Sequence, residues 1–191
     1  PTPPPPALLL RATIRQNAHE FTEALADLDQ VLAVEPNNAQ AWLTKAFILQ
    51  VQARYDEARR ACQPLTRLAA AHVLLGCLGD IAGVTGQSVK SRELLRQVLS
   101  DTTLSGRERI WIATILAETA TRTGAIREAE ESFAEAFKVG IKDQYLLGAY
   151  ADFLLDQRRY QDVMSLLQSE TRADGLLLRL ALAEQTLKLP T

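Results

Sequence analysis

The chain has 191 residues, and residues of the AVILMFWYC set make up 47% of it, which excludes an intrinsically disordered composition. Its formal net charge is −2 and its pI is near 5.8, which argues against a protein that wraps nucleic acid, because such proteins are normally basic. No apolar run approaches the roughly 18–20 residues that cross a bilayer. The longest, residues 176–182, contains Arg179 and is better interpreted as a docked helix.

Residues 1–6, PTPPPP, predict a flexible proline-rich lead-in. We interpret it as a spacer, and a PxxP ligand is the alternative. Because the printed sequence begins at Pro1, we expect a trimmed chain, and a removed signal segment would leave no trace in it. The compartment therefore stays open between the cytoplasm and a periplasmic or secreted location.

Residues 39–62 predict two short amphipathic helices joined by a tight turn. Trp42 and Ala46 lie on one face of the first helix, and Tyr55 and Ala58 on one face of the second. The two alanines let the helix axes approach closely, and the larger rings fill the space around that contact. The link at residues 52–54 is short enough to force an antiparallel hairpin.

The same pattern occurs once before in the chain, at a repeat period of about 34 residues. The matched pairs are Leu8 with Trp42, Ala12 with Ala46, Phe21 with Tyr55, Glu23 with Glu57, and Ala24 with Ala58, and Pro36 closes the first unit. This period and these residues resemble the tetratricopeptide repeat family. The resemblance implies an all-α fold, a right-handed superhelix (a TPR-like solenoid) of about five helical hairpins plus a C-terminal capping helix.

We expect one solenoid over residues 7–190. Its units cover about 5–38, 39–71, 72–105, 110–143 and 144–170, and the cap covers 171–188. Pro64 should kink or end the second helix of its unit, because proline removes a backbone donor. Ser88 and Ser91 replace the aromatic residue and the alanine of the third unit, which should weaken it. Ser105 and Glu108 predict a capping box at the start of the fourth.

The first helices of such arrays line a concave groove. The resemblance therefore implies a partner-binding groove that holds the apolar anchors and the acidic residues Phe47, Asp80, Trp111, Glu118, Tyr145 and Asp152. This mixture predicts a peptide or partner helix with apolar anchors and basic flanks. The alternative is that the acids only form a solvated face. Some relatives clamp acidic chaperone tails with Lys and Asn, and that clamp is absent here, because its places hold Leu9, Thr13, Thr44, Phe47 and Cys77.

The only two cysteines, Cys62 and Cys77, fall on facing helices of adjacent units in this register. A disulfide would close a loop of about 15 residues and contribute on the order of 3 kcal/mol. It would also imply an oxidising compartment. Two buried free thiols are the alternative.

Nothing in the sequence proposes a reaction. His19 and His72 are isolated, the cysteines lack zinc spacing, and no phosphate-binding or nucleophile motif is present. We predict no catalytic residue, no cofactor and no metal, and a monomer or weak homodimer that binds a protein or peptide. The alternatives are an assembly module that binds through its C-terminal helix and one domain of a larger enzyme.

Overall fold

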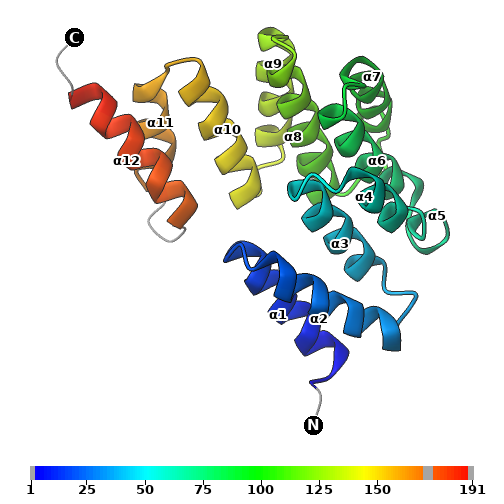
Figure 1. The fold of residues 1–191 in the computed structure, drawn as a ribbon. Coiled ribbons are helices and arrows are strands. Elements are labelled where there is room, and N and C mark those ends of the chain that lie inside the picture. Colours follow the sequence, from blue (N-terminus) through cyan, green and yellow to red (C-terminus); the bar gives the residue numbers. More distant parts are fainter. Residues whose placement is uncertain (1–2, 170–173, 189–191) are drawn as a thin grey trace. The chain divides into compact units, whose positions relative to one another are not determined.

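The computed structural model describes residues 3–169 and 174–188. These residues form α-helices in series, joined by short turns, and contain no strand (Figure 1). The predicted all-α fold of repeated helical hairpins is therefore confirmed. The helices group into two compact units, Pro1–Leu94 and Leu95–Thr191, whose boundary falls inside helix α7.

The first unit contains two complete hairpins, a short extra helix and most of a third hairpin. Its helices are α1 (Pro5–Asn17), α2 (Phe21–Val34), α3 (Ala39–Val51), α4 (Tyr55–Cys62), α5 (Leu65–Leu68), α6 (Ala71–Val84) and the first part of α7 (Ser88–Leu99). The small residues predicted at the close helix contacts are buried: Ala12 and Ala24 in the first hairpin, Ala46 and Ala58 in the second. The indole nitrogen of Trp42 donates to the Pro36 carbonyl oxygen at 2.9 Å, which ties α3 to the turn before it.

The second unit contains two hairpins and a last helix. Its helices are the end of α7, α8 (Gly106–Arg122), α9 (Ile126–Lys138), α10 (Gln144–Asp156), α11 (Tyr160–Leu167) and α12 (Asp174–Lys188). Ala117, Ala129 and Phe133 lie in a core that continues through Phe153 to Ala183 on α12. The last helix is therefore packed on the preceding hairpin by apolar burial.

Every hairpin turns through one residue with left-handed backbone. In each case the next residue donates its N–H to the carbonyl five residues back, at 2.8–3.0 Å, which is the Schellman way of ending a helix. The turn residues are His19 (φ 60°), Ala53 (φ 58°), Gly86 (φ 82°), Gly124 (φ 71°) and Arg158 (φ 58°). Only two of the five are glycine, although glycine suits this conformation best.

Three expectations from the sequence concern the residues at which helices begin or end. Helix α1 begins at Pro5, inside the expected lead-in, because a proline in the first turn needs no amide partner. Helix α4 ends at Cys62, and Pro64 caps the separate helix α5, as the proline predicts. The capping box at Ser105 and Glu108 is present, with N···O distances of 2.8 and 3.3 Å. Residues 1–2 of the lead-in and the start of the predicted cap, 171–173, lie outside the described residues.

Candidate protein-binding surface

Four of the predicted groove residues lie on two first helices of the second unit. Trp111 and Glu118 are two helical turns apart on α8, and Tyr145 and Asp152 have the same spacing on α10. Tyr145 follows Trp111 by one repeat period, and Asp152 follows Glu118 by the same period, so each pair holds one repeat position. We call these four residues and the surface they share the α8–α10 face.

One hydrogen bond links the two helices across this face. The Tyr145 hydroxyl donates to a Glu118 carboxylate oxygen, from α10 to α8. Both side chains are partly buried. The bond holds the phenol ring of Tyr145 beside the acid, and Trp111 on α8 is likewise only partly buried.

The same relationship recurs one repeat later with a different donor. Arg179 on α12 follows Tyr145 by one repeat period, and its guanidinium contacts Asp152 on α10 through Nε–Oδ1 at 2.6 Å and Nη2–Oδ2 at 2.5 Å. Both hydrogen bonds, Tyr145 to Glu118 and Arg179 to Asp152, span 27 residues. The hydrogen bond to Asp152 is the main cause that raises the pKa of Arg179. The charge of Asp152 is therefore offset within the chain.

The first unit holds the other two predicted residues. Phe47 lies partly buried on α3. Asp80 lies on α6 and is only 6% exposed. A carboxylate buried to this degree offers little charge to a partner, so we leave Asp80 out of the surface proposed below.

A tetratricopeptide repeat family model matches residues 17–73, which cover α2 to the start of α6. This stretch of the chain therefore carries tetratricopeptide repeats. A comparison with curated protein sequences finds no match.

Solved structures with the same fold include other repeat proteins. PilW, described as a widely conserved type IV pilus biogenesis factor, has a TM-score of 0.63 at 18% identity, over 95% of this chain and 86% of that one. PilF of Pseudomonas aeruginosa has a TM-score of 0.58 at 17% identity, over 96% and 84%. A tetratricopeptide repeat protein of Parabacteroides merdae has a TM-score of 0.53 at 14% identity, over 96% and 73%. At these identities the likeness concerns the fold alone.

A disulfide joins two successive helical hairpins through residues of the first unit. Cys62 at the end of α4 is bonded to Cys77 on α6, with an S–S distance of 2.03 Å and a Cα–Cα distance of 6.1 Å. Both residues are buried among apolar neighbours such as Leu65 and Ile81. The bond spans the irregular stretch that Pro64 and α5 introduce between the two hairpins.

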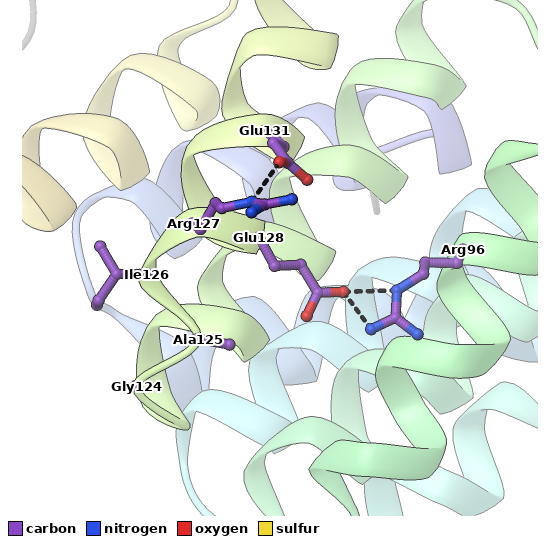
Figure 2. A pocket seen from close by; sticks show the side chains of 7 residues that line it. All are labelled: Arg96, Gly124, Ala125, Ile126, Arg127, Glu128 and Glu131. Atoms are coloured by element: carbon purple, nitrogen blue, oxygen red, sulfur yellow. Dashed lines mark hydrogen bonds and ion pairs between the residues drawn. The ribbon is translucent and has the colours of Figure 1, made fainter.

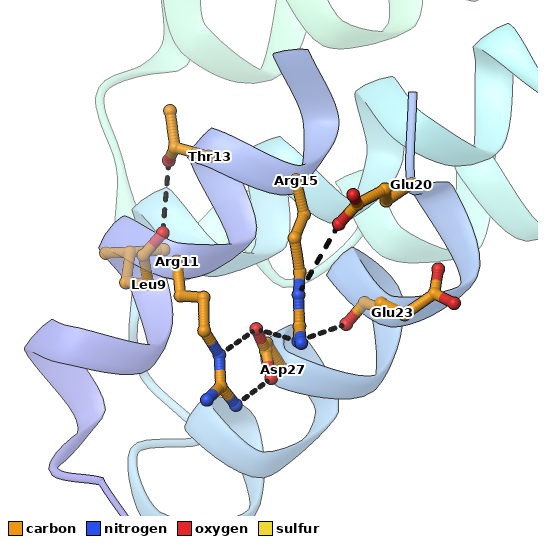
Figure 3. Close-up of polar contacts among 7 residues, drawn as sticks. All are labelled: Leu9, Arg11, Thr13, Arg15, Glu20, Glu23 and Asp27. Carbon is orange, nitrogen blue, oxygen red and sulfur yellow. Dashed lines mark hydrogen bonds and ion pairs between the residues drawn. The ribbon is translucent and has the colours of Figure 1, made fainter. Parts of the chain in front are cut away.

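A charge cluster around the buried Asp27 carboxylate links the two helices of the first hairpin (Figure 3). Asp27 on α2 is 1% exposed and accepts from Arg11 on α1 at 2.8 and 2.6 Å and from Arg15 at 2.6 Å. The Arg11 guanidinium, with help from Arg15, holds the pKa of the Asp27 carboxyl below its ordinary value, against the opposing effect of burial. No motif or spacing in the sequence indicated this cluster.

An open pocket at the start of α9 lies apart from the predicted residues (Figure 2). Arg96 donates from Nε to Glu128 Oε1 at 2.6 Å, and Arg127 donates to Glu131 Oε1 at 3.0 Å, so its charges are paired within the chain. The other lining residues are Gly124, Ala125 and Ile126, which have no reactive side chain.

The part of the chain that the structure describes lacks two kinds of feature. It contains no group of three or more His, Cys, Asp or Glu side chains placed to hold a metal ion. None of its helices combines the length and the apolarity that crossing a membrane requires.

Arg179 contacts Asp152 but was not among the residues that the sequence predicted for the groove. The available signal was its position one repeat period after Tyr145, which places it on the same line of first helices. In the sequence, a charged residue within the apolar run 176–182 indicated only that this segment is a helix packed on the protein and not a membrane span.

Proposed function

We propose that this chain is a non-enzymatic scaffold that binds a peptide or a partner helix on the α8–α10 face. The observation that carries the proposal is the repeated position of Trp111 and Tyr145 on successive first helices, with Glu118 as the hydrogen-bond acceptor of Tyr145. Large aromatic side chains that are only partly buried are the usual anchors of protein interfaces.

The arrangement favours apolar anchoring over charge recognition. A partner side chain that packs between the two aromatic residues would bury apolar area on both sides. Of the two acids on the face, Asp152 is offset by Arg179, and Glu118 accepts the Tyr145 hydroxyl. We therefore expect bound peptides to share an apolar or aromatic anchor, rather than a run of basic residues.

The experiment is selection from a random peptide library on the immobilised chain, followed by fluorescence anisotropy with the selected peptides. Trp111→Ala should weaken binding by about tenfold or more, because anchor residues typically contribute over 1 kcal/mol. Phe137→Ala is the matched control, since Phe137 is a 37% exposed aromatic residue on the second helix α9. Undiminished affinity in a folded Trp111→Ala variant would remove the proposal.

A further inference from the structure

The last helix carries exposed apolar side chains that the repeat pattern does not explain. On α12, Leu176 and Ala183 are buried against the preceding hairpin. Leu177, Leu178 and Leu182 are 38%, 73% and 51% exposed. Leu178 and Leu182 are one helical turn apart, and a contiguous exposed apolar patch is typical of a protein interaction site.

A further repeat hairpin is a poor candidate to cover this surface. In α10, Leu147, Ala151 and Leu154 are buried. The residues one repeat period later are Ala181, Gln185 and Lys188, and all three are exposed. A second helix packed on α12 in the usual way would have to bury an amide and an ammonium group without partners. Helix α12 therefore continues the pairing of first helices through Arg179 but lacks the residues that would receive a second helix of its own.

The exposed residues of α12 instead form a ridge that is complementary to itself. Successive steps of four and three residues along one helix face give the order Asp174, Leu178, Ala181, Gln185 and Lys188. The ridge is acidic at its N-terminal end, basic at its C-terminal end, and has a small residue at its centre. Within the described residues, neither Asp174 nor Lys188 forms an ion pair in the chain.

We propose that two copies of this chain associate through α12, antiparallel about a twofold axis at Ala181. In this register Asp174 of each copy faces Lys188 of the other, and the central alanines let the helices approach closely. Leu178 packs beside Leu182 of the second copy, so the exposed leucines are covered from both sides. The helix dipoles are antiparallel, which is the favourable arrangement.

The size of this contact predicts a weak dimer. A helix of 15 residues is about 22 Å long, so one ridge on each copy buries less than the roughly 800 Å² per partner of a standard interface. We expect the chain to be a monomer at low concentration and a dimer at high concentration, with a dissociation constant above about 1 µM.

The first experiment is sedimentation equilibrium of the whole chain over a wide concentration range at low salt. The double variant Leu178→Ser/Leu182→Ser should abolish the dimer. Val89→Ser should leave it intact, since Val89 is also an apolar residue 70% exposed on a helix, but on α7. Asp174→Lys and Lys188→Asp should each weaken dimerisation several-fold by placing like charges together, and the variant that carries both changes should recover it, because the pair is restored in the reversed sense.

A cross-link tests the position of the axis. Cys62 and Cys77 are bonded to each other, so an introduced cysteine is the only thiol in the unreduced protein. Ala181→Cys should give a covalent dimer under mild oxidation. Gln185→Cys, on the same ridge, should not, because the two copies of residue 185 would be about 12 Å apart along the axis, beyond the Cα separation of a disulfide.

The outcomes separate clearly. The proposal is supported if the double leucine variant is monomeric, if the double charge reversal restores the dimer, and if a cross-link forms at residue 181 but not at residue 185. A monomer at every concentration overturns it, including one that binds only a different protein through α12. Oligomers beyond the dimer overturn it, because a twofold contact closes at two copies. A dimer that survives loss of both leucines overturns it as well.

Discussion

Arg179 on α12 binds both carboxylate oxygens of Asp152 on α10, in the same repeat position from which Tyr145 on α10 binds Glu118 on α8. Two chemically different donors, a guanidinium and a phenol, thus perform one structural task on successive first helices. The consequence is that α12 is positioned by a polar contact in addition to the burial of Leu176 and Ala183.

The first prediction concerns the strength of this contact. A double-mutant cycle with Asp152→Asn and Arg179→Gln should give a coupling free energy of about 0.5–1 kcal/mol, because the Asp152 side chain is 53% exposed and water screens the pair. Urea unfolding of the four proteins measures it. A second cycle with Arg127→Gln and Glu131→Gln is the control, since these two side chains are 91% and 66% exposed and should show a smaller coupling.

The hairpins could be predicted from the sequence because their packing is encoded locally. Ala46 and Ala58 must be small for two helices to touch, and Pro64 must end a helix, whatever the rest of the chain does. Ser91 in place of alanine predicts a weaker third hairpin. The structure places its hydroxyl 2.6 Å from the Gly79 carbonyl oxygen, so the buried polar group is paired.

The polar contacts could not be predicted because they depend on which long side chain reaches which partner. Asp27 looks like any surface acid of an amphipathic helix until Arg11 and Arg15 are seen to converge on it from α1. Asp80 was predicted to line an open groove, yet it is buried on a helix in which Gly76 and Gly79 are also buried. Hydrophobic periodicity predicts which face of a helix is buried, but not which polar side chains beside that face form hydrogen bonds or ion pairs with each other.

The second prediction concerns the hairpin turns. Ala53→Gly should stabilise the protein by about 0.5–1 kcal/mol, because Ala53 holds a left-handed backbone at φ 58° that glycine adopts without strain. Gly124→Ala should destabilise it by a similar amount for the same reason, and an added Cβ at Gly124 would meet nothing within 4 Å, so only the backbone is tested. Thermal unfolding of both variants decides this. Equal melting temperatures for both variants and the parent chain would show that the turn conformation contributes nothing.

The third prediction concerns the disulfide. Replacing Cys62 and Cys77 together by serine should destabilise the first unit by about 3 kcal/mol, because the bond closes a loop with a sequence separation of 15 residues. Chemical denaturation with and without reductant measures the effect. The parent chain should lose stability on reduction, and the double serine variant should be indifferent to reductant. Titration of two free thiols in the native, unreduced protein would contradict the bond itself.

The last prediction follows from the charge cluster in the first hairpin. Because hydrogen bonds from Arg11 and Arg15 lower the pKa of Asp27 in the folded state, its contribution to stability is complete above the unfolded pKa of about 4. It is lost as the pH falls through the lower, folded pKa, where the carboxyl takes up a proton and the ion pairs disappear. Asp27→Asn should therefore cost about 1–3 kcal/mol at pH 7, since it removes charged hydrogen bonds from a buried site. The difference in unfolding free energy between parent and variant should be flat from pH 7 to pH 5 and should shrink below pH 4. Asp29→Asn is the matched control, because Asp29 lies on the same helix with a side chain that is 61% exposed. A parent-to-variant difference that does not change between pH 7 and pH 2 would show that Asp27 acts through its shape and not its charge.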